Sequence, residues 1–299
     1  MKLLSGLVFS LLLSRIASIP NYKGNSNKLR PVIFMHGIFN KPGESNFSRD
    51  YISQAVPGIL FYHIDLWNGI VESARNIDTQ LSTILPTMQA IMDNHTDTGV
   101  TLLCYSQGGV ICRAAVEMLA HHNVHTLITL SSPLSGQYGV TSDVEPFVPS
   151  KDRAFLWRFW YSWEGQAISI GNYWNDPHHQ TKFADPELNV PLARLNNQFA
   201  HNFTAEYKRN FVRLERLVMI GGPNDTIITP WQSAHFGFYD KNETALPFEK
   251  QPWYLNDAFG LRTLNEANKV MRHTYGGLEH IYWYRTPAVF DCCVIPYIK

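Results

Sequence analysis

The stretch Val100–Leu119, VTLLCYSQGGVICRAAVEML, decides the fold of this chain. It opens with a short apolar run that is typical of a buried strand, and from Val110 onward its apolar residues recur at helical spacing. Ser106 stands at the junction, and two glycines follow shortly after it. In a strand, turn and helix of this kind, a serine can lie at a sharp corner that exposes its hydroxyl above the sheet. The stretch therefore predicts such a corner, with Ser106 as the candidate nucleophile.

The turn departs from the usual pattern of a nucleophile elbow. That pattern is G-x-S-x-G, whereas this chain reads Cys104-Tyr105-Ser106-Gln107-Gly108 and lacks the first glycine. On this motif alone, a catalytic serine and a structural serine in the turn of any α/β protein are equal alternatives. The catalytic interpretation depends on further motifs.

Apolar strand-like runs alternate with helix-length segments along most of the chain, which favours an α/β class with a mostly parallel central sheet and helices on both faces. The predicted strands are Pro31–Met35, Ile59–Ile64, Val100–Tyr105, His125–Leu130, Leu217–Ile220 and Lys269–His273. The predicted helices are Glu72–Asp93, Gln107–His121 and Ala288–Ile298.

One segment, at about residues 137–210, interrupts this alternation. It contains Phe155–Trp174, in which eight of twenty residues are aromatic. We interpret it as a cap inserted into a single domain of residues 19–299, with most of the aromatic side chains forming the core of the cap. Part of the cap could also line a groove for an acyl chain, in which each buried methylene is worth about 0.8 kcal/mol.

A second motif supports the elbow. The apolar run PVIFM ends in His36-Gly37, a common start of the loop that supplies one oxyanion-binding N–H in α/β-hydrolases. The predicted oxyanion donors are the backbone N–H groups of Ile38 and Gln107. An ordinary glycine turn after a strand is the alternative, and we interpret His36 itself as structural.

A serine hydrolase of this fold also needs an acid and then a base, in that chain order. Asp225 follows the apolar run LVMIGG and is the best candidate for the acid, whereas Asp240 and Asp257 do not directly follow a strand-like run. For the base, His280 in a loop is favoured over His273 inside the last predicted strand. The motifs together predict an α/β-hydrolase fold with a catalytic set of Ser106, Asp225 and His280.

The N-terminus predicts entry into the secretory pathway. Residues 1–18 have one lysine, an apolar core and small residues at the end, as in a signal peptide, and no second apolar stretch is long enough for a transmembrane segment. Glycosylation is predicted at the sequons of Asn46, Asn94, Asn202 and Asn242. A fifth sequon, Asn224, is expected to stay unoccupied because a glycan there would crowd Asp225. The formal net charge is zero and no basic run exists, so nucleic acid is not an expected partner.

Several motifs in order carry a resemblance to a known family. They are HGIF (36–39), LLCYSQGG (102–109), LITLSSPLSGQYG (127–139), GNYWNDPHH (171–179), VMIGGPNDTIITPWQS (218–233), HFGFYD (235–240) and GLEH (277–280). Together they resemble the palmitoyl-protein thioesterase family, in particular its lysosomal second branch, over nearly the whole mature chain. The resemblance implies a lysosomal glycoprotein that hydrolyses long-chain acyl thioesters, with Ser106 as nucleophile, Asp225 as acid and His280 as base.

The cysteines partly depart from that family. Its members in this branch carry cysteines where this chain has Trp160, Gly171 and His273, so Cys293 lacks its expected partner and Cys292 is additional. A less rigid cap is expected as a result.

A disulfide between Cys104 and Cys112 is predicted from spacing. Cys104 lies two residues before the corner in the strand, and Cys112 lies five residues into the helix that follows. Both cysteines are therefore expected at a similar depth, about 7 Å from the corner. Two buried thiols are the alternative, and the pairing of Cys292 and Cys293 cannot be derived from the sequence.

We therefore expect a lysosomal serine hydrolase that releases fatty acids from S-acyl substrates, acyl-CoA or S-acylated cysteine, without a metal ion or cofactor. A lipase or carboxylesterase that acts on oxyesters is the first alternative, because the same three residues would serve it. A non-catalytic lipid-binding protein on the same scaffold is the second. The sequence does not indicate an oligomeric state.

Overall fold

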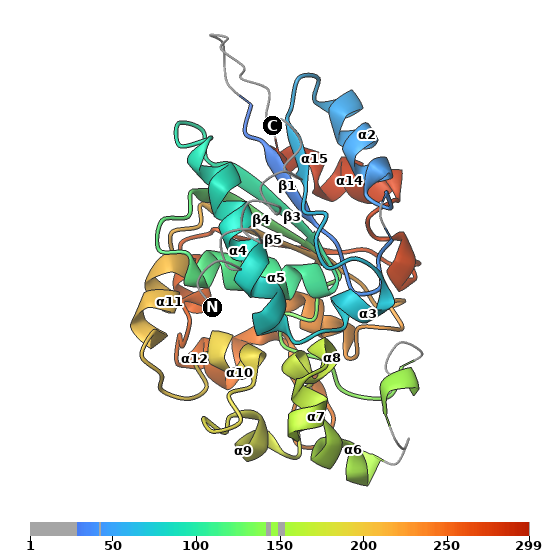
Figure 1. Cartoon of the computed structure of the whole chain (residues 1–299), viewed down its shortest axis with the longest axis vertical. Helices are drawn as coiled ribbons and strands as arrows, with labels where there is room; N and C mark the ends of the chain where they lie inside the picture. Colours follow the sequence, from blue (N-terminus) through green and yellow to red (C-terminus); the bar gives the residue numbers. More distant parts are fainter. Residues whose placement is uncertain (1–28, 42, 142–144, 149–152, 299) are drawn as a thin grey trace, which may run out of the picture.

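A computed structural model describes residues 29–41, 43–141, 145–148 and 153–298, so the predicted signal peptide lies outside the described residues. At its centre is a six-stranded sheet in the order β2-β1-β3-β4-β5-β8, in which every neighbouring pair is parallel (Figure 1). The strands are β1 (Val32–Met35), β2 (Phe61–His63), β3 (Val100–Tyr105), β4 (Val124–Leu130), β5 (Arg216–Gly221) and β8 (Val270–Thr274). All six predicted strands are confirmed, with small shifts at their ends.

Helices cover both faces of this sheet, as predicted. One face packs on α4 (Ile77–Asp93), α5 (Gln107–Met118) and α11 (Thr204–Phe211), and the other on α2 (Asn46–Ala55), α14 (Pro287–Cys293) and α15 (Ile295–Ile298). Strand β1 shows how the two cores arise, because Ile33 and Met35 belong to the first core and Val32 and Phe34 to the second. Alternate residues of a strand point to opposite faces, so a strand buried on both sides is apolar throughout.

Three predicted helix boundaries were wrong. The first predicted helix, Glu72–Asp93, is divided into α3 (Gly69–Ser73) and α4. The break has a cause in Asn76, whose side chain accepts hydrogen bonds from the N–H groups of Asp78 and Thr79 and so caps α4 at its start. The second, Gln107–His121, ends earlier, at Met118, and the third, Ala288–Ile298, is interrupted at Val294 between α14 and α15.

The segment between β4 and β5 holds several short helices, none of which we predicted individually. They are α6 (Arg153–Trp160), α7 (Trp163–Gln166), α8 (Ser169–Tyr173), α9 (Gln180–Phe183) and α10 (Pro191–Leu195), and they lie together at the lower end of Figure 1. Helix α11 follows them and packs against α5. The division of the chain into a sheet domain and a cap at about residues 137–210 remains a prediction.

Other elements after β5 were not predicted. They include the hairpin β6 (Phe238–Tyr239) and β7 (Ala245–Leu246), and the helices α12 (Pro252–Leu255) and α13 (Leu261–Glu266).

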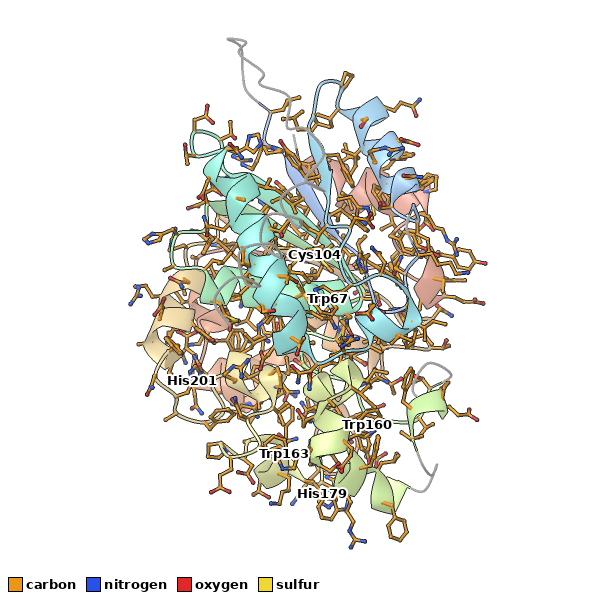
Figure 2. The ribbon with its side chains drawn as sticks, viewed as in Figure 1. Trp67, Cys104, Trp160, Trp163, His179 and His201 are labelled. Atoms are coloured by element: carbon orange, nitrogen blue, oxygen red, sulfur yellow. A yellow bond between two sulfur atoms is a disulfide. The ribbon has the colours of Figure 1, made fainter. Side chains whose placement is uncertain are left out.

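Trp160 and Gly171, the two positions in this segment where the resemblance led us to expect cysteines, lie next to each other. Trp160 is fully buried, stacks on Trp174 with ring centroids 5.5 Å apart and is labelled in Figure 2. A Cβ on Gly171 would lie 3.1 Å from the Trp160 ring and 2.2 Å from the carbonyl oxygen of Gly165. The indole of Trp160 therefore occupies the space beside Gly171, which has no side chain. The effect of the missing cysteines on the rigidity of the cap stays a prediction.

Arg113 connects α5 to the helices below it. Its guanidinium donates to Glu117 Oε1 at 2.7 Å, to Asn196 Oδ1 at 2.7 Å, and to the carbonyl oxygens of Leu134 and Leu195 at 3.1 and 2.9 Å. Arg113 and Glu117 are both completely buried. Three of these hydrogen bonds join α5 to Leu134, Leu195 and Asn196, and the ion pair within α5 holds the guanidinium in place to make them.

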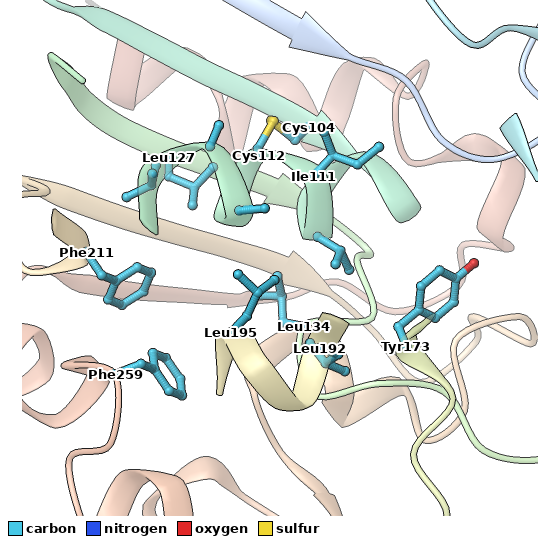
Figure 3. Close-up of a cluster of buried hydrophobic side chains, with 14 of the residues drawn as sticks. Cys104, Ile111, Cys112, Leu127, Leu134, Tyr173, Leu192, Leu195, Phe211 and Phe259 are labelled. Atoms are coloured by element: carbon cyan, nitrogen blue, oxygen red, sulfur yellow. A yellow bond between two sulfur atoms is a disulfide. The ribbon is translucent and has the colours of Figure 1, made fainter. Parts of the chain in front are cut away.

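Two disulfides are present in the described chain. Cys104 in β3 and Cys112 in α5 are joined, with their Cα atoms 6.5 Å apart (Figure 3). This is the pair that the spacing predicted, and it ties the strand before Ser106 to the helix after it. Cys292 and Cys293, whose pairing the sequence left open, are joined to each other.

Candidate active site

The corner at Ser106 has the shape that the sequence predicted. Ser106 connects β3 to α5 with φ of 54° and ψ of −128°, a backbone conformation that is unfavourable for a residue with a side chain. Its N–H donates to the carbonyl oxygen of Leu130 at 2.9 Å. Close approach to β1 follows at Gly108, where a Cβ would lie 2.4 Å from the carbonyl oxygen of His36 and 2.6 Å from that of Met35.

We expect Gly108→Ala to lower kcat/KM about 100-fold, because its methyl group would push α5 away from the end of β1 and displace Ser106 by a fraction of an ångström or more. Hydrolysis kinetics together with thermal unfolding would measure this. Gly276→Ala is the matched control, since a Cβ there would meet only the Asn224 side chain, at 4.0 Å. Unchanged kinetics in a folded Gly108→Ala variant would contradict the geometry.

Ser106, His280 and Asp225 form a hydrogen-bonded series. Ser106 Oγ and His280 Nε2 are 2.8 Å apart, and His280 Nδ1 and Asp225 Oδ2 are 2.7 Å apart. With the proton of a neutral imidazole on Nδ1, where it is donated to the carboxylate, Nε2 can accept the Ser106 hydroxyl proton. The three side chains lie beyond the carboxyl ends of β3, β8 and β5, which adjacent parallel strands bring to one edge of the sheet.

The three side chains are largely buried. Ser106 and His280 are each 5% exposed, and Asp225 is 6% exposed. Burial by itself would raise the pKa of Asp225, but hydrogen bonds from His280, from the Ser131 hydroxyl and from the backbone of Ile228 outweigh it and hold that pKa below its ordinary value. Asp225 is therefore ionised at pH 4 and above.

The loop after β1 also lies against Ser106. A Cβ on Gly37 would be 2.9 Å from the Cβ of Ser106, which places the backbone of this loop in contact with the corner. The Gly37 N–H donates to Asn40 Oδ1 at 3.1 Å, and both ring nitrogens of His36 lie 2.8 Å from carbonyl oxygens, those of Gly37 and Leu66. These contacts fit the structural role expected for His36.

The two predicted oxyanion donors belong to the two segments that meet here, Gln107 to the start of α5 and Ile38 to the loop after β1. Gln107 is the first residue of α5, so its N–H has no acceptor within the helix. Ile38 directly follows Gly37 in the loop. The function of both N–H groups stays a prediction.

The rival candidates lie elsewhere. His273 is in β8 and its Nε2 is 2.7 Å from the Tyr297 hydroxyl. Asp240 accepts from the N–H groups of a tight turn, and Asp257 accepts from Thr263 and pairs with Lys208 at 2.9 Å.

Sequence reasoning missed three side chains that contact the acid and base. Ser131 and Trp283 both donate to Asp225, and the Tyr105 hydroxyl donates to the carbonyl oxygen of His280 at 3.0 Å. Tyr105 and Ser131 lie inside the quoted motifs LLCYSQGG and LITLSSPLSGQYG, but no spacing rule pairs them with Asp225 or His280.

The remaining predictions concern the surface and bound groups. The side chains of Asn46, Asn94, Asn202 and Asn242 are exposed, as N-glycosylation requires, and their occupancy stays a prediction. Among the described residues, no group of three or more His, Cys, Asp or Glu side chains could hold a metal ion. Within the same residues, no helix has both the length and the apolar character to cross a membrane.

The parallel sheet, the serine corner after β3 and the hydrogen-bonded series of Ser106, His280 and Asp225 define an α/β-hydrolase. The chain belongs to the palmitoyl protein thioesterase family, whose sequence pattern matches residues 31–280. It is 42% identical over 272 residues to the lysosomal thioesterase PPT2 of Rattus norvegicus, covering 90% of this chain and 88% of that protein.

Two further relatives extend this similarity. The Homo sapiens lysosomal thioesterase PPT2 is 40% identical, with 90% of this chain and 88% of that protein covered. The PPT2 homolog of Drosophila melanogaster is 37% identical, with 90% and 92% covered. Among solved structures, the Bacillus licheniformis lipase BlEst2 matches with a TM-score of 0.47 and 14% identity over 91% of this chain and 93% of that chain, a likeness too weak to carry a functional conclusion.

Proposed function

We propose that this protein is a lysosomal acyl-thioester hydrolase that releases fatty acids from S-acyl substrates, acyl-CoA or S-acylated cysteine, by a Ser-His-Asp mechanism. The observation that carries the mechanism is the continuous series of hydrogen bonds from Ser106 through His280 to Asp225. Thioester hydrolysis and the lysosomal location are supported by relatives that are 40–42% identical to this chain and are lysosomal thioesterases.

In the first half of the proposed reaction, Ser106 Oγ attacks the thioester carbonyl carbon while His280 Nε2 takes the hydroxyl proton. Asp225 holds the imidazole with its Nδ1 proton facing the carboxylate, which leaves Nε2 free to act as a base. The carbonyl oxygen becomes an oxyanion that accepts hydrogen bonds from the N–H groups of Ile38 and Gln107, each worth about 3 kcal/mol. The tetrahedral intermediate then breaks its C–S bond, and the thiol leaves with the proton from His280.

In the second half, water replaces the thiol. His280 takes a proton from the attacking water, the ester bond to Ser106 breaks, and Ser106 Oγ recovers the proton as the fatty acid leaves. A thiolate is a better leaving group than an alkoxide, so expulsion of the thiol depends less on protonation by His280. The geometry of the three side chains serves oxyester cleavage equally, so a lipase or carboxylesterase is the second candidate.

We expect kcat/KM for palmitoyl-CoA to exceed that for a palmitoyl oxyester of matched chain length. The comparison is made with purified protein at acidic and neutral pH, with Ser106→Ala as the background control. A higher kcat/KM for the oxyester would assign the protein to the lipase and carboxylesterase class. Binding of both acyl compounds without Ser106-dependent turnover of either would indicate a non-catalytic lipid-binding protein.

A further inference from the structure

The carboxylate of Asp225 has more donors than the proposed mechanism uses. Its Oδ2 accepts from His280 Nδ1 at 2.7 Å, from Trp283 Nε1 at 2.8 Å and from the Ser131 hydroxyl. Its Oδ1 accepts from the backbone N–H groups of Ile227 and Ile228, both at 3.0 Å. Rotation of this carboxylate would therefore break up to five hydrogen bonds.

Trp283 reaches Asp225 because of the local backbone. His280–Tyr282 form the 3₁₀ helix η4, and the Trp283 N–H closes it on the carbonyl oxygen of His280 at 3.5 Å. A 3₁₀ helix has three residues per turn, so side chains three positions apart project in the same direction. The imidazole and the indole consequently meet the same carboxylate oxygen. Trp283 is completely buried, so water does not compete for its N–H.

Ser131 approaches from the sheet. It directly follows β4, and its N–H donates to the carbonyl oxygen of Ile220 in β5 at 2.7 Å. Its φ of 43° is in the left-handed region, which is unfavourable for a serine. Backbone strain of this kind is retained where the surrounding structure requires it, and here it accompanies the hydrogen bond to Asp225.

From these contacts we propose that Trp283 and Ser131 are positioning residues of the hydrolase, which hold Asp225 Oδ2 toward His280 and share its negative charge. The inference rests on the proposed function, because orienting Asp225 toward His280 contributes to catalysis only if His280 acts as a base. Both side chains donate to Asp225 and act on the reaction through this carboxylate.

This arrangement makes a directional prediction about pH. Each donor withdraws charge from the carboxylate, and its loss makes Asp225 a stronger proton acceptor, with a higher pKa. Asp225 must be ionised to hold the His280 imidazole in the tautomer that leaves Nε2 free. Loss of the Trp283 or Ser131 donor therefore moves the acid limb of the pH profile to higher pH, whereas a loss of packing alone lowers the rate without moving the limb.

The test uses Trp283→Phe, which keeps an aromatic ring and removes the N–H, and Ser131→Ala, which removes the hydroxyl. Trp253→Phe is the control for the first, because Trp253 is also buried and its Nε1 has no hydrogen-bond partner within the described residues. Ser132→Ala is the control for the second, because Ser132 is the adjacent buried serine. Among the described residues, the hydrogen bond recorded for its hydroxyl is a long one, 3.5 Å, to the carbonyl oxygen of Leu130. Circular dichroism and thermal unfolding establish that each variant is folded.

The measurement is the rate at which a fluorophosphonate probe labels Ser106 between pH 4 and 8, alongside turnover of palmitoyl-CoA. We expect each positioning variant to be labelled about 10-fold more slowly than wild type, with its acid limb raised by about half a pH unit, and each control to stay within about twofold. Since the two variants remove independent donors, either one suffices if the other does not fold. Wild-type labelling kinetics in both folded variants, or equal losses in variants and controls with no movement of the acid limb, would overturn the inference.

The two proposals fail separately. Labelling does not require an acyl substrate, so a wild-type protein that is labelled at Ser106 but hydrolyses no thioester would refute the proposed substrate class and leave the positioning roles measurable. A folded wild-type protein that is not labelled at all would overturn both.

Discussion

We expect Ser106→Ala to lower kcat for thioester hydrolysis by about 10⁴-fold or more while the fold stays intact. The expected loss is large because the serine is the covalent nucleophile, and without it His280 has no group to activate. The expected effect on folding is within about 1 kcal/mol, because the change removes one hydroxyl and one hydrogen bond, 2.8 Å long, to His280. Acyl-CoA turnover and denaturant unfolding of the purified variant measure the two effects.

Ser132→Ala is a suitable control for Ser106→Ala, since it removes another buried hydroxyl near the corner without touching His280. A folded Ser106→Ala protein with turnover comparable to wild type would refute the assignment of the nucleophile. If Ser106→Ala were inactive because it unfolds, the control and the unfolding curve would show it.

The strands and the serine corner were predictable because their signals are local. Strand β3 is buried at every residue, and the sequence shows it as a mostly apolar run, with Thr101 as its polar member, that ends before Ser106. The break between α3 and α4 has one local signal, the N-cap residue Asn76, which the periodicity argument did not use, and one distant partner that no local pattern reports. The N–H of Ile77 donates to Asn172 Oδ1 at 2.6 Å, across 95 residues of sequence.

The short helices between β4 and β5 escaped prediction for a different reason. Helices α7 and α9 have four residues each and α8 and α10 have five, which is little more than one turn. Apolar periodicity needs a window of about 11 residues or more before it distinguishes a helix. Packing between side chains such as Trp160 and Trp174 defines these elements, and no local pattern reports that packing.

For the candidate site, chain order and strand position predicted the three residues that are hydrogen-bonded in the structure. Asp225 and His280 stood out because each occurs in a loop near the end of a predicted strand, which in a parallel sheet brings both to one edge. Trp283 could not be found in this way. Its relation to Asp225 follows from the 3₁₀ turn that starts at His280, and a tryptophan in an apolar sequence predicts only core packing.

Stability is expected to depend most strongly on Arg113. Replacement by Met should destabilise the fold by about 3–5 kcal/mol, because it leaves the carboxylate of Glu117 buried without its cation. The acceptors Leu134, Leu195 and Asn196 would lose a donor at the same time. Glu117 Oε2 already lacks a hydrogen-bond partner within the described part of the chain, and Arg194 acts on the carboxylate only as a more weakly coupled positive charge. Denaturant unfolding monitored by circular dichroism measures the loss.

The pH dependence separates this explanation from a simple loss of packing. Burial raises the pKa of Glu117 from 4.5 to about 7 despite the opposing effect of Arg113. The folded-state pKa is above the unfolded value, so the stability that this group contributes is complete below pH 4.5 and is lost as the pH rises through 7. Without Arg113 the pKa of Glu117 rises further, so its carboxyl group is neutral at pH 5. At pH 8 the buried carboxyl group either ionises without a cation beside it or keeps a proton that the unfolded chain has released, and both destabilise the fold.

Arg113→Met should therefore destabilise the protein more at pH 8 than at pH 5. In the double variant Arg113→Met/Glu117→Leu both charges are gone, and an apolar pair of similar volume should recover about 2 kcal/mol or more relative to the single variant at pH 8. The double variant should also lose most of the difference between the two pH values, because its titrating group is absent. A single variant that is equally destabilised at both pH values, and that the second substitution does not rescue, would show that Arg113 acts through the volume it fills between α5 and α10 and not through its charge.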